Sequence, residues 1–240
     1  MVRTTHEWFK TLDERFWLRP DDVGAEEAAF IREALHLRRG RRVLDAPCGA
    51  GRIAVHLAKA GCVMTGVDIR ETFIKRARAR FRKESLSGRF LALDLRELDI
   101  DGEFHAIYNW FGSFGYFSDA ENADLLRRYA RALRPGGRLL IDQPNREFML
   151  RHFRAEIDEG LFVKRTRWDG ASQRVITDRY AQGKADPRNV SSMRLYTPGQ
   201  MKALLARAGL RIESIYGSLG GEAYGRGSRR MVVVARKGES

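Results

Sequence analysis

Cysteine is scarce in this sequence of 240 residues, and long apolar runs are missing from it. Cys48 and Cys62 are too few for the disulfide framework that small secreted domains need, so they fit a reducing compartment. No apolar run approaches the length of a membrane span, and the first ten residues lack the apolar core of a signal peptide. We therefore expect a cytoplasmic protein without a membrane segment.

Acidic residues are also few relative to basic ones. Lys and Arg number 44 against 31 for Asp and Glu, which gives a formal net charge of +13. Such a charge fits either a polyanionic partner or arginines spread over solvated surfaces. The densest basic run, residues 74–83, places its apolar residues at helical spacing and leaves no aromatic residue among the outward cations to stack on bases. We favour solvated surfaces and expect no nucleic-acid partner.

Hydrophobic residues make up 43% of the chain and charged residues 31%, which is typical of a globular protein with one sizeable core. Apolar runs that indicate strands alternate with segments of helical periodicity, and these runs occupy residues 41–48, 62–69, 89–95, 103–110 and 138–144. This order predicts a parallel sheet covered by helices on both faces. Two further runs, residues 210–216 and 228–236, are expected to pair as an antiparallel hairpin.

Residues 161–196 interrupt this order. Three runs in this segment nearly alternate polar and apolar residues and are separated by turn residues; they occupy residues 161–168, 173–181 and 190–196. So few residues cannot enclose a core of their own, so they predict a small three-stranded antiparallel insertion rather than a second full domain.

The segment before the first strand has helical spacing, carried by Trp8, Phe9, Leu12 and Phe16. With this helix the chain divides into three parts. We expect an N-terminal helical cap over residues 1–40, a central domain over residues 41–145 and 197–240, and a lid insertion over residues 146–196.

The most informative stretch is VLDAPCGAGR, residues 43–52, in which an apolar run ends at Asp45 and breaks into a loop at Gly49 and Gly51 before a predicted helix. Glycine permits close approach of a ligand to the backbone, and the helix that follows directs its positive end at the loop. Gly49, Gly51 and Ala54 also satisfy the dinucleotide pattern G-x-G-x-x-G/A, so the loop alone leaves two cofactor classes open.

Acidic residues recur at the ends of the first three predicted strands, where ligands of open parallel sheets bind. Asp68 closes the second run and offers a carboxylate that matches the two hydroxyls of a ribose, and Ile69 beside it can pack on an adenine ring. Asp94, with Leu95, follows the third run. Each aspartate is also compatible with a helix cap or a turn, but three in succession beside a glycine loop favour a binding site.

A loop rich in aromatic residues, NWFGSFGYF at residues 109–117, follows the fourth strand. Loops seldom carry so much apolar surface, and aromatic faces stabilise cations by about 0.5 to 2 kcal/mol. We expect Trp110 or Phe111 to line a cofactor, Tyr116 to face a substrate, and the remaining rings to pack in the core.

The pattern D-x-x-x-G-x-G at residues 45–51, together with these strand ends, the aromatic loop and LRPGGRLLID at residues 133–142, resembles the class I S-adenosylmethionine-dependent methyltransferases of the small-molecule type. The resemblance covers about residues 20–236. It implies an α/β, Rossmann-like sheet of seven strands with helices on both faces and the last strand antiparallel. Two departures are His105, where relatives often carry aspartate, and Pro47 within the first motif.

The resemblance also implies S-adenosylmethionine as the cofactor and a set of residues that contact it. We assign to this contact Asp45, Ala46, Gly49, Gly51, Asp68, Ile69, Asp94, Leu95, Asn109 and Trp110. We assign no metal site. The insertion is similar to the lid of bacterial N-methyltransferases that act on amino sugars, amino acids or peptide amines.

The expected reaction is an in-line displacement that moves a methyl group to a small-molecule acceptor. The similarity to N-methyltransferases implies an amine nitrogen as the acceptor, and a neutral amine can attack without a general base, whereas a hydroxyl usually needs one. Tyr116, His152 and Arg194 are the candidate catalytic residues, and Tyr180 and Tyr196 are further candidates. The alternatives are an RNA methyltransferase, a nicotinamide-dependent oxidoreductase and a cofactor-binding protein without catalysis. The sequence leaves the substrate and the oligomeric state open.

Overall fold

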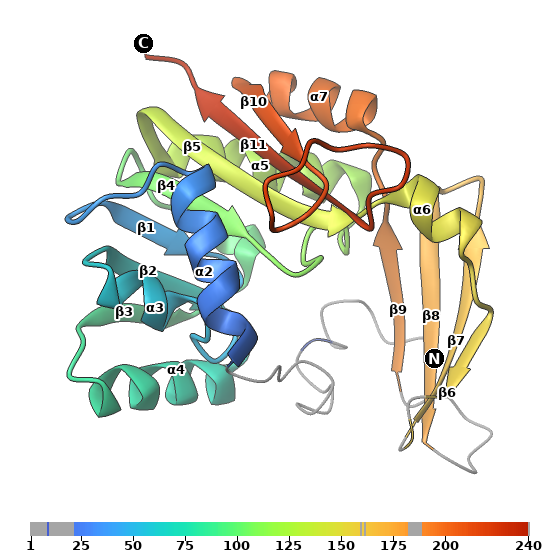
Figure 1. Ribbon diagram of the computed structural model, residues 1–240, viewed down its shortest axis with the longest axis horizontal. Coiled ribbons are helices and arrows are strands. Elements are labelled where there is room, and N and C mark those ends of the chain that lie inside the picture. The colour runs from blue at the N-terminus through green and yellow to red at the C-terminus, as the bar shows by residue number, and fades with distance from the viewer. Residues whose placement is uncertain (1–8, 10–21, 159, 161, 182–188, 240) are drawn as a thin grey trace.

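The computed structural model describes residues 9, 22–158, 160, 162–181 and 189–239, and it contains a seven-stranded sheet and a separate four-stranded sheet (Figure 1). The strand order of the larger sheet is β10-β11-β5-β4-β1-β2-β3. Its parallel strands are β1 (Arg42–Asp45), β2 (Val63–Asp68), β3 (Gly88–Ala92), β4 (Phe104–Asn109) and β5 (Leu133–Pro144). The chain ends in β10 (Leu210–Tyr216) and β11 (Arg230–Lys237).

The last strand, β11, is antiparallel to both of its neighbours, β10 and β5. The predicted terminal hairpin is therefore confirmed, and so is the Rossmann-like sheet with an antiparallel last strand. The helices are α2 (Asp22–Ala34), α3 (Ala54–Lys59), α4 (Glu71–Lys83), α5 (Asp119–Ala132), α6 (Arg146–Arg151) and α7 (Pro198–Arg207), with a 3-10 turn, η2, at Leu95–Glu97.

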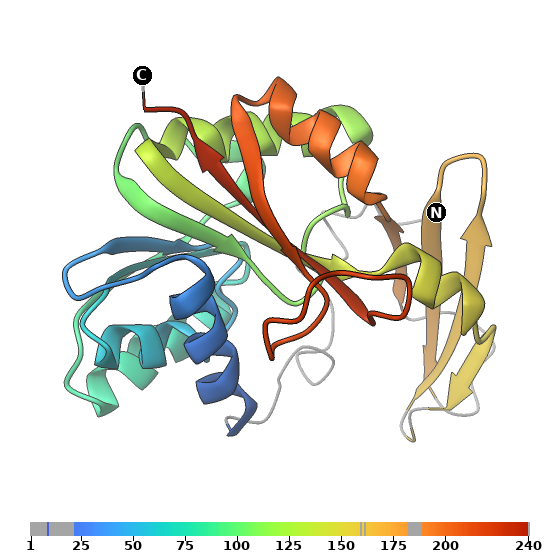
Figure 2. The same cartoon turned by 45° about the horizontal axis from the view of Figure 1, so that its top comes forward.

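Both faces of the larger sheet are buried, because successive side chains of each strand point into two different hydrophobic clusters. Val43 of β1 packs in the cluster beneath α2, α3 and α4, whereas Leu44 packs in the cluster beneath α5 and α7. In β11, Val232 and Val233 divide in the same way. Figure 2 shows the two groups of helices on opposite faces of the sheet. The prediction of helices on both faces is confirmed.

Helices α5 and α7, which cover the same face of the larger sheet, both begin at capping boxes. The Ser118 side chain accepts a hydrogen bond from the Glu121 backbone N–H, and the Glu121 carboxylate accepts one from the Ser118 backbone N–H. Thr197 and Gln200 make the same exchange at the start of α7. Each box satisfies backbone groups that a helix start leaves unpaired, so the sequence fixes where these helices begin.

The insertion forms a sheet of four strands in the order β6-β7-β8-β9, not three as predicted. Its strands are β6 (Glu156–Asp158), β7 (Phe162–Asp169), β8 (Arg174–Ala181) and β9 (Asn189–Arg194), all paired antiparallel. The added strand, β6, has only three residues, which is too short to show an alternating pattern. Figure 1 shows this sheet standing to one side of the larger sheet, joined to it through α6.

The predicted N-terminal helix lies outside the described residues except for Phe9. Among the helices that the structure describes, none is long and apolar enough to cross a membrane.

Candidate functional site

A cleft opens at the carboxyl ends of β1 and β2, between the loops that follow β1, β2, β3 and β4. It brings together eight of the predicted site residues: Asp45, Gly49, Asp68, Ile69, Asp94, Leu95, Trp110 and Tyr116. Arg52 of the glycine loop also lines the cleft, as do Arg70, Phe73 and Arg80, for which the sequence predicted no role in binding. Segments far apart in the sequence therefore meet at the edge where parallel α/β sheets bind ligands.

The glycine loop has two glycines in the left-handed region, and they serve different purposes. Gly51, at φ +73°, packs against α4, since a Cβ there would lie 3.1 Å from the Cβ of Ala77. Gly49, at φ +50°, lines the cleft, and a Cβ there would meet nothing within 4 Å. The space in front of Gly49 is thus open to a ligand, whereas Gly51 is required by close packing and does not line the cleft.

Asp68 at the end of β2 organises the loop. One carboxylate oxygen accepts the backbone N–H of Gly49 at 2.9 Å, and the other accepts the N–H of Arg70 at 2.9 Å. Each carboxylate oxygen has two acceptor positions, so both oxygens keep one for a ligand. Burial raises the pKa of Asp68, and it raises the pKa of Asp45 well above its usual range.

Asp94 lies two residues beyond the end of β3, not at the end of the strand as predicted. β3 ends at Ala92, and Asp94 caps η2 by accepting the backbone N–H of Arg96 at 2.9 Å. Its carboxylate also pairs with the Arg96 guanidinium at 2.8 Å. Asp94 thus has the capping role that its residue type also allowed, and it still lines the cleft beside Leu95.

The aromatic loop is held in place by a buried carboxylate. Phe111 has φ +60°, and its backbone N–H donates to Asp142 of β5 at 3.0 Å. Arg230 of β11 also pairs with Asp142, at 3.0 Å, and its guanidinium lies 4.8 Å from the ring centre of Trp110. Burial raises the pKa of Asp142 to about 6, although the cation and the N–H donors oppose this shift.

Ala46 and Asn109 do not line the cleft, in contrast to their predicted contact with the cofactor. Both are fully buried beneath it. The Asn109 side chain and the Tyr129 hydroxyl donate to the carbonyl of Ala46 at 2.9 and 3.0 Å. These bonds satisfy a buried carbonyl between β1 and β4, so the two residues support the loops that form the site.

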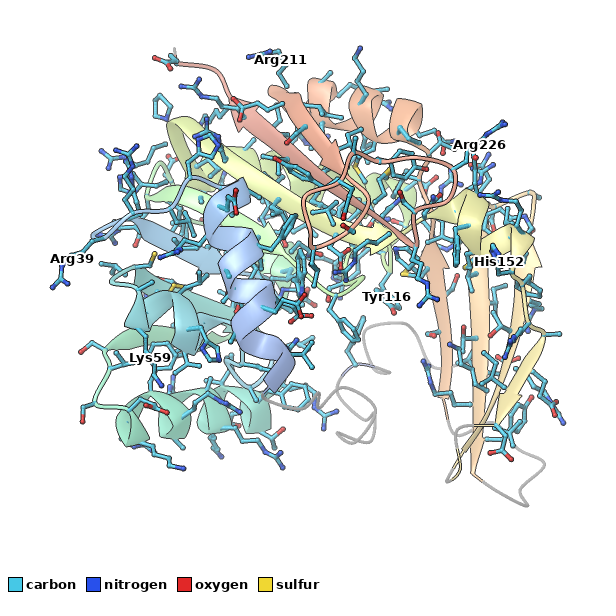
Figure 3. All side chains as sticks on the ribbon, in the orientation of Figure 1. Arg39, Lys59, Tyr116, His152, Arg211 and Arg226 are labelled. Atoms are coloured by element: carbon cyan, nitrogen blue, oxygen red, sulfur yellow. The ribbon has the colours of Figure 1, made fainter. Side chains whose placement is uncertain are left out.

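Tyr116 points into the middle of the molecule, in the region between the larger sheet and the insertion (Figure 3). Phe9 packs edge-on against its ring, with ring centroids 5.0 Å apart. Burial raises the pKa of Tyr116 to about 12. The phenol therefore stays protonated at neutral pH and can donate a hydrogen bond, but it is a poor general base.

His152 lies outside the cleft. It follows α6 on the surface, where it stacks on Phe148 with ring centroids 4.1 Å apart, and Figure 3 shows it at the insertion, away from Tyr116. Its Nδ1 atom lies 2.8 Å from the Phe148 carbonyl oxygen.

Arg194 is buried outside the cleft and ties the insertion to the central domain. Its guanidinium donates to the carbonyls of Ser172 and Gln173, and its backbone N–H donates to Gly115 at 2.8 Å. A Cβ on Gly115 would lie 2.4 Å from the Arg194 carbonyl, so this crossing requires glycine. Arg194 also faces Asp119 at 3.5 Å.

An ion pair between Glu27 and Arg52 was not predicted. Arg52 lines the cleft and lies 2.6 Å from the carboxylate of Glu27 on α2, with exposed side-chain fractions of 14% and 7%. A Cβ on Gly24 of the same helix would lie 3.0 Å from Arg52 Cγ. The helix therefore closes tightly over the glycine loop. No local pattern in the sequence pairs these two positions.

Comparisons with known proteins agree with this geometry. Residues 43–137 match a family model described as a methyltransferase domain. The 27-O-demethylrifamycin SV methyltransferase of Amycolatopsis mediterranei is 30% identical over 224 residues, which cover 87% of this chain and 79% of that protein. The ubiquinone biosynthesis O-methyltransferase of Coxiella burnetii is 29% identical over 119 residues, and the match spans half of each chain.

Solved structures share the whole architecture. The CcbJ methyltransferase from Streptomyces caelestis superimposes with a TM-score of 0.80 over 98% of both chains at 20% identity. A sugar N-methyltransferase from Streptoalloteichus superimposes with a TM-score of 0.66 over 94% of this chain and 91% of the other, at 22% identity. At this level of identity the similarity concerns the fold.

Proposed function

The chain belongs to the class I S-adenosylmethionine-dependent methyltransferases, and we propose that it transfers a methyl group from S-adenosylmethionine to a small-molecule acceptor, with an amine nitrogen as the attacking atom. The observation that carries the proposal is the cleft itself. It joins an open glycine loop, the carboxylate of Asp68 and an aromatic loop at the carboxyl edge of the sheet. The relatives include both O- and N-methyltransferases, so the choice of nitrogen depends on the residues of this chain.

The cleft fits the cofactor at its polar groups. We assign the ribose to Asp68, whose two carboxylate oxygens each keep an acceptor position after binding Gly49 and Arg70. We assign the adenine to Ile69 and to Asp94 with Leu95, which also line the cleft. The open space at Gly49 leaves room for the methionine part against the backbone.

The aromatic loop suits the reacting end of the cofactor. When bound, S-adenosylmethionine supplies an electrophilic methyl group on a positively charged sulfur with a good leaving group. Phe111, Tyr116 and Phe117 present ring surface to the cleft, while Arg230 covers the ring of Trp110. Ring faces stabilise a nearby cation by about 0.5 to 2 kcal/mol and exclude water from the path of attack.

The carboxylates in the described lining of the cleft are those of Asp45, Asp68 and Asp94, and all three lie on the strand ends and loops that we assign to the cofactor. This described lining contains neither His nor Lys, and the Tyr116 phenol stays protonated because burial raises its pKa to about 12. The carboxylate of Asp68 is engaged at the cofactor end. A neutral amine attacks without a base, whereas a hydroxyl acceptor usually needs one, so these side chains favour nitrogen.

We assign the acceptor to the space between the aromatic loop and the insertion, which acts as a lid. Arg174 of β8 supports this role, because its guanidinium donates to the carbonyls of Gly115 and Phe117 at 3.0 and 2.8 Å. Arg194 adds its backbone bond to Gly115. The insertion is thus fastened to the loop that carries Tyr116, and Arg194 is a positioning residue rather than a catalytic one.

The proposal is tested with a panel of acceptors in which each amine is matched by the alcohol of the same skeleton. Transfer of isotope-labelled methyl from S-adenosylmethionine is followed by mass spectrometry. We expect the amines to react, with a rate that rises with pH through the pKa of the acceptor amine itself. Preferential labelling of the alcohols or phenols would contradict the assignment to nitrogen. Loss of all transfer while the cofactor still binds would indicate a binding protein without catalysis.

A further inference from the structure

A second, open depression lies at the edge of the sheet opposite the cleft, where α2 ends and where β1, β4 and β5 begin. Figure 1 shows these element ends. Basic side chains dominate its lining, which includes Arg38, Arg41, Arg134, Arg138, His36 and His105. Because the cleft is at the carboxyl ends of the strands and the depression at their amino ends, the two sites are separated by the length of the sheet.

An irregularity between β4 and β5 shapes this depression. Phe104 pairs with Leu133 and Ala106 pairs with Arg138, so His105 alone lies opposite residues 134–137. The backbone there bulges through Gly136, at φ +70°, and through Gly137, whose Cβ would lie 2.9 Å from the Arg134 carbonyl. The bulge thus places the side chain of Arg134 beside the imidazole of His105.

The contact between Arg134 and His105 lacks an acceptor. His105 Nδ1 accepts the backbone N–H of Arg42 at 3.1 Å, so in the neutral ring Nε2 carries the proton. That Nε2 atom lies 3.0 Å from a guanidinium nitrogen of Arg134, which is also only a donor. Two donors therefore converge on one point, and an anionic oxygen placed there would accept from both.

The surrounding charges favour an anion. The nearby carboxylates are engaged elsewhere, since Glu103 pairs with Arg42 and Glu213 pairs with Arg138. Within the described part of the chain, no carboxylate forms an ion pair with the side chains of Arg38, Arg41 or Arg134. Burial and the neighbouring guanidinium groups lower the pKa of His105, which favours the neutral ring.

We propose that this depression binds a phosphate group, whose oxygen accepts from His105 Nε2 and Arg134 while Arg38 and Arg41 balance the remaining charge. Arginine suits this role because its planar fork presents several donors to the oxygens of a phosphate. The phosphate can come from a small phosphorylated compound or from the backbone of a nucleic acid, and the chemistry at the site is the same. This site does not depend on the proposed methyl transfer, and it gives part of the excess positive charge a specific use.

The test is calorimetric titration of the full chain with inorganic pyrophosphate and, separately, with a short single-stranded RNA at physiological ionic strength. Two variants perturb the site. Arg134→Gln removes one of the two converging donors, and His105→Asp supplies a carboxylate that pairs with Arg134 in place of the ligand. Arg211→Gln is the matched control, because Arg211 of β10, which is labelled in Figure 3, is exposed and does not line the depression. Binding of S-adenosylmethionine reports whether each variant is folded.

We expect saturable binding of pyrophosphate that weakens by about tenfold or more in both site variants and is unchanged in Arg211→Gln, since one charge-assisted hydrogen bond is lost. Addition of pyrophosphate should also raise the pKa of His105, measured by NMR of its ring protons. RNA binding that is weakened by the same two variants and displaced by pyrophosphate would support the site with a nucleic acid as its source. Equal weakening in Arg211→Gln, or no saturable binding of either probe, would overturn the proposal.

Discussion

Replacing Glu27 by Gln is expected to destabilise the protein by about 3 kcal/mol, because Arg52 would keep a largely buried charge without its partner. The carboxylate and the guanidinium lie 2.6 Å apart and are only 7% and 14% exposed, so water screens the pair little. Breaking a buried pair by removing one partner costs about 3 to 5 kcal/mol, and the amide oxygen of Gln recovers about 1 kcal/mol as a neutral hydrogen bond. For a chain of this size the loss corresponds to a fall in Tm of about 6 to 12 °C.

The assay is urea denaturation of Glu27→Gln beside Glu26→Gln, a matched control that removes the same charge from an exposed position on the same helix. A double-mutant cycle with Arg52→Met then isolates the interaction between Glu27 and Arg52. We expect the control to change stability by less than about 0.5 kcal/mol. If Glu27→Gln proves equally mild, or if the cycle gives no coupling energy, then α2 does not hold the glycine loop through this pair.

Four further substitutions have defined outcomes. Burial raises the pKa of Asp142 from an ordinary value of 3.8 to about 6, so the folded chain binds this proton more tightly than the unfolded chain does. The free energy of unfolding should therefore fall as the pH rises from about 4 to about 6. Asp142→Asn should flatten this part of a plot of the urea midpoint against pH. Gly66→Ala should destabilise the fold by about 1 to 3 kcal/mol, because a Cβ there would lie 2.6 Å from the Phe90 ring. In Gly49→Ala the new Cβ would meet no atom within 4 Å, so thermal unfolding should show a loss of only about 1 kcal/mol from backbone strain. The same Gly49→Ala substitution should remove cofactor binding. His152→Ala should leave methyl transfer within about twofold of the parent, and a loss of about a hundredfold would return this histidine to the reaction.

The sequence predicts most of the larger sheet, because its strands are buried on both faces and therefore appear as short, continuous apolar runs. The capping boxes at Ser118 and Thr197 are equally local, since each is complete within one helical turn. The strand β6 could not be predicted in this way, because three residues carry too little pattern to separate it from a loop.

The residues of the site also differ in whether local sequence patterns predict their positions. Asp68, Gly49 and Trp110 lie at the ends of predictable strands, so their place at the cleft follows from the topology of a parallel sheet. Asp142 shows the opposite case. It sits within an ordinary apolar strand, and its role depends on Arg230, which is 88 positions away. The close crossing of Gly115 over Arg194 likewise exists only once the insertion has folded against the aromatic loop.

The central claim, that the cleft binds S-adenosylmethionine through Asp68, is tested most directly by isothermal titration of the protein with S-adenosylmethionine, its demethylated product and NADH. The same titrations are made on Asp68→Asn and on Asp101→Asn, an exposed control. We predict saturable binding of the first two ligands, weakened by about tenfold or more in Asp68→Asn and unchanged in the control, and no binding of NADH. Binding of NADH alone, or binding of S-adenosylmethionine that Asp68→Asn leaves unchanged, would contradict the account.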